Sequence, residues 1–138
     1  MLRPVNLTVA AVFAAFSLIY IPRLFVLKAQ TQQPEGLDNA NPRAQQAKLD
    51  GIGARALGAH NNAFEAFAPF AAAALFCRYS PSYLTSKDTI DAICGVHVLL
   101  RLVYTSLYIG NIPTARTAVW VLAQGATTAL FYLAFMGG

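Results

Sequence analysis

Four long apolar segments restrict what this chain can fold into. They cover residues 4–22, 56–76, 89–109 and 114–136. The hydrocarbon core of a bilayer is about 30 Å thick, which a helix of roughly 20 residues can span. Soluble core helices are rarely this long or this unbroken. The sequence therefore predicts an all-α integral membrane four-helix bundle, one domain over residues 1–138, with spans near 4–28, 43–77, 87–109 and 114–136.

The low charge content agrees with a membrane location. Charged residues make up 12% of the chain, whereas soluble domains carry roughly 25%. The first segment could instead be a secretory signal peptide, because Arg3 precedes it. We expect it to be retained as a span, because no A-x-A cleavage site follows and its 19 residues exceed an ordinary signal-peptide apolar region.

Helix-starting residues place the spans more closely. Asn41 and Pro42 suit the N-cap and the first position of a helix, which we expect to run continuously over about 42–77. Ser86 is a candidate cap for the third helix, and Pro113 suits the start of the fourth.

Basic residues predict the orientation of the bundle. The side that holds the first loop carries Arg23, Lys28, Arg43, Lys48 and Arg116, and the other side carries Arg3, Arg78 and Lys87. Because short cytoplasmic loops are enriched in Lys and Arg, we expect the first-loop side to be cytoplasmic and both termini to be non-cytoplasmic. These flanks also account for the net charge of +4 without a nucleic-acid partner.

Polar residues recur at helical spacing inside three of the spans. The stripes are Arg55, Asn62 and Glu65 on the second span, His97, Arg101, Tyr104 and Tyr108 on the third, and Arg116, Trp120, Gln124 and Thr127 on the fourth. Ionisable residues within spans usually face the bundle interior or a water-filled cavity. The three stripes should therefore face one another or a neighbouring subunit.

Four arginines should gather toward the cytoplasmic leaflet: Arg23, Arg55, Arg101 and Arg116. We expect Arg55 or Arg101 to lie within ion-pair reach of Glu65, because a lone charge in hydrocarbon is costly. One carboxylate cannot neutralise four guanidinium groups, which favours an anionic ligand or lipid headgroups. Two alternatives stay open: a purely structural ion-pair network, and arginines that extend to the membrane interface.

Two other residue types point to packing. His60 lies off the stripe, and Glu65 follows it without H-E-x-x-H spacing, so we expect packing or hydrogen bonding at a helix end and no metal. Cys77 and Cys94 could pair, although isolated cysteines in membrane helices are more often small apolar packing residues.

The stretch RALGAHNNAFEAFAPF at 55–70 resembles the second-helix signature of the MAPEG superfamily, the membrane-associated proteins in eicosanoid and glutathione metabolism. That signature reads approximately R-x-x-x-A-H-x-N-x-x-E-x-x-x-P-F. The likeness continues in RLVYTSLYIGN at 101–111 and ARTAVWVLAQ at 115–124, and it is greatest to the short bacterial-type branch.

The resemblance implies four transmembrane helices per subunit, a homotrimer, and glutathione bound between adjacent subunits near the cytoplasmic side. Asn62 and Glu65 would hold the glutamyl end, and Arg116 with Thr117 would stabilise the thiolate. The rest of the implied pocket comprises Arg23, Arg55, Arg101, Tyr104, Tyr108 and Trp120.

Several positions depart from the family pattern. Catalytic members commonly carry a basic residue where this chain has Asn61, and some carry another where it has Gly58. Tyr104 replaces a histidine, and Trp120 stands where several members have tyrosine. Thr117 keeps a hydroxyl where the prostaglandin synthase type has serine.

Two functions of different class therefore compete. The first is a glutathione-dependent transferase, isomerase or peroxidase that acts on a lipophilic small molecule. The second is a non-catalytic member that serves as a structural or lipid-binding subunit of a larger membrane complex, in contact with membrane lipids. A transporter or channel is less consistent with the sequence, because no inverted repeat is visible.

Overall fold

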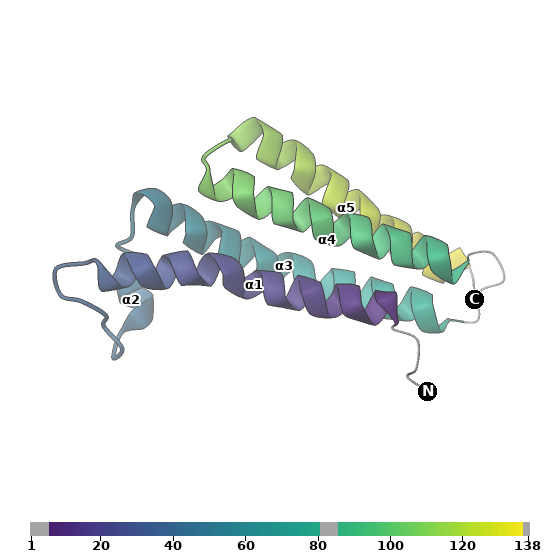
Figure 1. The fold of residues 1–138 in the computed structure, drawn as a ribbon, viewed down its shortest axis with the longest axis horizontal. Helices are drawn as coiled ribbons and strands as arrows, with labels where there is room; N and C mark the ends of the chain where they lie inside the picture. The colour runs from purple at the N-terminus through teal and green to yellow at the C-terminus, as the bar shows by residue number, and fades with distance from the viewer. Residues whose placement is uncertain (1–5, 81–85, 137–138) are drawn as a thin grey trace.

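The computed structural model describes residues 6–80 and 86–136. In chain order its elements are α1 (Leu7–Thr31), α2 (Pro42–Gln46), α3 (Gly51–Tyr79), α4 (Lys87–Ile109) and α5 (Pro113–Met136). Every regular element in these ranges is a helix, and the four long helices form a bundle (Figure 1). The predicted all-α four-helix bundle is confirmed. Residues 4 and 5, where the first span was predicted to begin, lie outside the described ranges.

The two ends of the bundle differ. α1 begins and α5 ends at the same end, which we call the terminal end (Figure 1). The opposite end carries α2 and the connection between α4 and α5, and we call it the α2 end. α1 packs mainly along α3, and α4 along α5.

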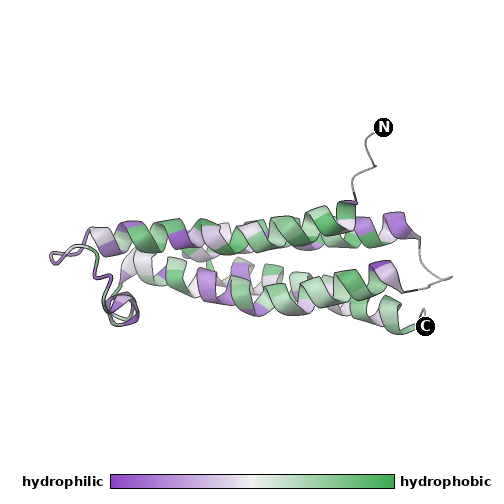
Figure 2. Cartoon of the chain, turned by 90° about the horizontal axis from the view of Figure 1, so that it is seen from below, coloured by the Kyte–Doolittle hydropathy of each residue, from purple (hydrophilic) through white to green (hydrophobic). Residues whose placement is uncertain are grey.

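The outer faces of the bundle are apolar. Among the described helices, α1, α4 and α5 are long and apolar enough to cross a membrane. α3 is the longest, at 29 residues, but it carries the polar stripe of the second predicted span. Large side chains such as Phe13, Leu122 and Phe135 are at least 60% exposed, and Figure 2 shows green apolar stretches along the lengths of the helices. An apolar exterior of this extent suits lipid rather than water, as in an integral membrane protein.

The apolar core lies in the half nearer the terminal end. Phe70, Cys77, Cys94 and Leu130 meet there, together with small alanines of α1 and α3. Both cysteines are free and buried, as the packing interpretation predicted. The alanines let the helices approach closely, which is how membrane helices gain packing energy.

The predicted helix starts are confirmed. Asn41 is the N-cap of α2 and Pro42 is its first residue, and Pro113 is the first residue of α5. Ser86 caps α4, and its hydroxyl accepts the Thr89 N–H at 3.2 Å.

The expected continuous helix over 42–77 is wrong, because the chain breaks between α2 and α3. Asp50 is extended, and Gly51 has a φ of +47°, a left-handed conformation that glycine adopts without steric cost. Gln45 explains the break, because it fastens α2 to the end of α1. Its side-chain oxygen accepts from Gln30 Nε2 at 2.9 Å, and its amide nitrogen donates to the Gly36 carbonyl.

Candidate functional site

A pocket of about 250 Å³ opens between α3, α4 and α5, and we call it the Arg116 pocket. Its lining residues are Asn62, Tyr104, Arg116, Thr117 and Trp120. The polar stripes of three helices therefore meet here, as their spacing predicted. All five residues belong to the set that the sequence indicated.

Two arginines and two tyrosines pack in series beside this pocket, although Arg101 and Tyr108 do not line it. The Arg101 guanidinium carbon lies 4.4 Å from the centre of the Tyr104 ring. Tyr104 meets Tyr108 edge to face, with ring centres 5.7 Å apart. The Arg116 guanidinium carbon lies 4.3 Å from the centre of the Tyr108 ring. Cation–π contacts of this kind contribute about 0.5–2 kcal/mol each, and they hold the two cations in place without neutralising them.

The expected ion pair of Glu65 with Arg55 or Arg101 is wrong within the chain. Arg101 Nη2 donates instead to the Asn62 side-chain oxygen at 2.8 Å, and Asn62 Nδ2 donates to Glu65 at 3.2 Å. Asn62 thus connects the buried cation to the carboxylate. Glu65 is exposed in the single chain, and its hydrogen-bond partner in the described residues is the Asn62 amide, so a partner for its charge has to come from outside the chain.

Arg55 does not join the pocket. Its Nε donates to the carbonyl of Ile109 at 3.0 Å. Ile109 is the last residue of α4, where carbonyl groups have no intrahelical donor. In this structure Arg55 therefore caps α4 and joins it to α3.

Thr117 and Trp120 both line the pocket, one with a hydroxyl and the other with an aromatic ring. The Thr117 hydroxyl donates its only proton to the Pro113 carbonyl at 3.1 Å, so a lone pair is what it offers to the pocket. Trp120 is 39% exposed and supplies an apolar rim.

Gly58 makes room for Tyr108. A Cβ atom at Gly58 would overlap the Tyr108 hydroxyl and lie 2.8 Å from its Cζ atom. The phenol therefore lies against the backbone of α3, and the Tyr108 ring supports Arg116 from that position. The departure at Gly58 is structural in this chain, because a longer side chain there would displace Tyr108.

Arg23 lies in a second pocket, of about 260 Å³, between α1, α2 and α3, which we call the Arg23 pocket. Its lining residues are Tyr20, Arg23, Pro42, Arg43, Gln46, His60, Asn61 and Phe64. With its amide oxygen turned toward Arg23, buried Gln46 accepts from Nη1 and Nη2 at 2.8 and 3.2 Å. Asn61 and Asn62 are consecutive on α3 and point about 100° apart, so each reaches a different pocket.

Of the residues that line the Arg23 pocket, only Arg23 was predicted as a site residue; among the polar ones that were not are Arg43, His60 and Asn61. Arg43 lies on α2. The Gln45 contacts hold α2 against the end of α1, and no pattern in the sequence predicts that arrangement. His60 Nδ1 lies 2.8 Å from the Ile19 carbonyl in the middle of α1, so His60 has the expected structural contact, but with a mid-helix carbonyl and not at a helix end. The same bond places its ring at the pocket wall.

Other polar residues of the stripes are structural. His97 stacks on Phe70 with ring centres 3.9 Å apart and hydrogen-bonds through Nδ1 to the Ala123 carbonyl. Within residues 6–80 and 86–136, no group of three or more His, Cys, Asp or Glu side chains could hold a metal ion.

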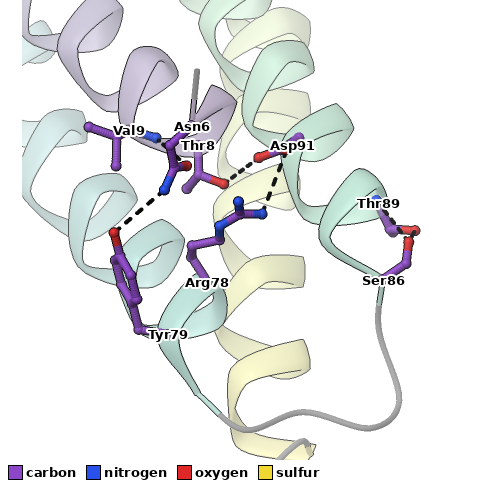
Figure 3. Close-up of polar contacts among 8 residues, drawn as sticks. All are labelled: Asn6, Thr8, Val9, Arg78, Tyr79, Ser86, Thr89 and Asp91. Carbon is purple, nitrogen blue, oxygen red and sulfur yellow. Dashed lines mark hydrogen bonds and ion pairs between the residues drawn. The ribbon is translucent and has the colours of Figure 1, made fainter. Parts of the chain in front are cut away.

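Figure 3 shows a polar cluster at the terminal end, and none of its residues lines either pocket. Arg78 Nη1 is 3.7 Å from one oxygen of Asp91, and the Thr8 hydroxyl donates to the other. In the part of the chain that the structure describes, this is the one ion pair. Because it joins α1, α3 and α4, it fixes their relative positions at that end.

Comparison with known proteins places the chain in a family. Neither the curated proteins nor the solved structures gave a match. The model of the MAPEG family matches residues 6–136, which contain all five helices and both pockets. The chain belongs to the MAPEG family.

Proposed function

We propose that this protein binds glutathione in the Arg116 pocket and uses its thiolate against a lipophilic electrophile. The observation that carries this is a charge imbalance. In the described residues, neither Arg101 nor Arg116 has a carboxylate within 4.0 Å. A carboxylate of the ligand can pair with Arg116, the ligand can also contact Asn62, which is the partner of buried Arg101, and its ammonium group can pair with exposed Glu65.

Arg116 is the residue that we assign to the thiol. It reaches the pocket from the first turn of α5 and is held by the Tyr108 ring. A nearby cation favours the thiolate over the thiol. With an activated aryl chloride as substrate, sulfur forms a bond to carbon, chloride leaves with the electron pair, and the thiol proton passes to water. Thr117 can assist only after its hydroxyl turns away from Pro113.

We further propose that the complete site lies between subunits of a homotrimer. The two pockets lie on different sides of α3, and each is open to the surroundings of the single chain. A neighbour that brings its Arg23 pocket to the Arg116 pocket would add Arg23 to the same ligand. A second copy would also cover Glu65.

Thermal unfolding in detergent tests the binding step. Reduced glutathione should raise the melting temperature of the wild type, because a ligand at 100 times its dissociation constant stabilises by about 2.7 kcal/mol. Glu65→Gln and Arg116→Ala should abolish that increase, and Lys87→Gln at the terminal end of α4 is the matched control. A wild-type protein whose melting is indifferent to millimolar glutathione would contradict the proposal.

A non-catalytic role is the second candidate, and two observations favour it. The Thr117 proton is used within α5, and Trp120 places a ring without a hydroxyl at the rim. Glutathione binding without chloride release from the aryl chloride would select this candidate. Chloride release that Arg116→Ala removes would select the transferase.

A further inference from the structure

A groove of about 670 Å³ lies at the α2 end, between the end of α1, the start of α3 and the end of α4. It shares no lining residue with the Arg116 or Arg23 pocket. Its apolar wall includes Phe25, Ile52 and Ile109, and its charged residues are Lys28, Lys48 and Asp50. Neither proposed half of the glutathione site uses this groove.

The three charged side chains of the groove have no ion-pair partner among the described residues. Over residues 6–80 and 86–136, none of Lys28, Lys48 and Asp50 takes part in an ion pair. Asp50 is the N-cap residue of α3, yet its side chain makes no capping hydrogen bond. The N–H groups of the first turn of α3 are therefore left uncapped by Asp50, at the end of the helix that favours a phosphate.

We expect the groove to lie where a bilayer changes from hydrocarbon to headgroups. Lys28 is in the last turn of α1, a helix apolar enough to cross the membrane. The residues that follow α1 are mostly hydrophilic, and they appear as the purple end of the chain beyond the green helices (Figure 2). Phe25 is 43% and Ile52 54% exposed, so an acyl chain can reach both side chains.

We propose that this groove binds the headgroup of an amine-bearing phospholipid, phosphatidylethanolamine. The phosphate pairs with Lys28 and Lys48 beside the first turn of α3. The ammonium donates to the Asp50 carboxylate, and the start of an acyl chain covers Phe25 and Ile52. The charges of the groove favour this headgroup over two others. Phosphatidylglycerol has no cation to pair with Asp50, and phosphatidylcholine has a quaternary amine without an N–H to donate.

Native mass spectrometry of the full chain in detergent tests the proposal. The probes are phosphatidylethanolamine, phosphatidylcholine and phosphatidylglycerol with the same acyl chains. The wild type should retain phosphatidylethanolamine several-fold more than either of the others. Asp50→Asn should remove the preference over phosphatidylcholine, while Lys28→Gln and Lys48→Gln should lower retention of all three.

Matched variants at the terminal end provide the control. Lys87→Gln and Asp88→Asn remove the same charges from exposed positions at the start of α4, and retention should stay at the wild-type level. Stronger retention of phosphatidylglycerol would mean that the groove is only a basic surface and would overturn the proposal. Equal effects of the groove and control variants, or no retained lipid because a second copy covers the groove, would overturn it as well.

Discussion

Arg101 keeps its guanidinium inside the bundle, 4% exposed, with an amide oxygen and a phenol ring as its nearest partners. Removing the partner of a buried charge costs more than the bond itself contributes, because the charge is then left without a replacement. The importance of Asn62 follows from this. It holds the cation in position although it carries no charge itself.

We expect Asn62→Leu to destabilise the unliganded protein by about 1.5–3 kcal/mol, the usual range for a hydrogen bond to a charged group. Glu65→Gln should not destabilise the unliganded protein, because Glu65 makes no ion pair in the described chain and a glutamine oxygen can still accept the hydrogen bond from Asn62. Thermal unfolding without glutathione measures both. Asn61→Leu is the matched control. A larger loss from Glu65→Gln than from Asn62→Leu would show that the carboxylate is the true partner of Arg101.

The residue types of the site could be predicted from the sequence, but their pairing could not. Helical spacing placed Arg101, Tyr104 and Tyr108 on one face, and the structure has them there. The same spacing set Asn62 and Glu65 one turn apart, so a long arginine side chain could reach either. Burial decides between them, because the amide lies nearer the interior and the carboxylate lies at the surface. Burial depends on how the neighbouring helices pack, so the spacing of residues along one helix does not reveal it.

Glycines in α3 control how closely the other helices approach. Gly58 meets the Tyr108 ring, whereas nothing lies within 4 Å of a Cβ built on Gly95 of α4. Replacing a helical glycine by alanine stabilises by up to about 1 kcal/mol when space is free, but inserting a methyl group into a packed contact costs about 1–3 kcal/mol. Comparing alanine substitutions at Gly58 and Gly95 therefore separates the effect of helix preference on stability from the effect of the contact with Tyr108.

We expect Gly95→Ala to raise the melting temperature and Gly58→Ala to lower it. Gly58→Ala should also weaken the response to glutathione, because Tyr108 carries Arg116. In a Tyr108→Ala background the ring is gone, and Gly58→Ala should then be as favourable as Gly95→Ala. If Gly58→Ala remained destabilising in that background, the contact with Tyr108 would not be the reason for the glycine.

Element boundaries were predictable where a single residue fixes them. Pro42, Ser86 and Pro113 act through their own backbone or side chain, so the sequence shows them directly. The break before Gly51 is different. A glycine can continue a helix at a cost of about 1 kcal/mol, and what decides against continuation here is the attachment of Gln45 to Gln30, fifteen positions earlier.

Basic residues are more numerous at the α2 end than at the terminal end, which predicts the orientation of the molecule in the membrane. We expect the α2 end, with Lys28 and Lys48, to face the cytoplasm. Gln32→Cys should be protected from a membrane-impermeant maleimide in intact cells, and Ser86→Cys should be labelled. Wild-type Cys77 and Cys94 are buried and give the background. Labelling of Gln32→Cys alone would mean that the chain inserts the other way round.

Assembly is the scale at which the glutathione proposal can be tested most directly. Arg23 and Arg116 lie in separate pockets of one chain. If a neighbouring subunit supplies Arg23, a trimer made only of Arg23→Ala chains or only of Arg116→Ala chains has no complete site. When the two variants are co-expressed and assemble at random, about a quarter of the subunit interfaces carry both arginines.

We therefore expect each variant alone to lose the binding of glutathione. Mixed trimers selected through both tags should regain about a third of the wild-type stoichiometry, because one of their three interfaces carries both arginines. Titration calorimetry on protein purified through two tags, one on each variant, measures this. No chain in the mixture holds both arginines, so sites formed within single subunits would recover nothing. If the mixed assembly bound no more glutathione than the single variants did, while the wild type bound it, the site would lie inside one chain. A wild type that does not bind would instead reject glutathione as the ligand.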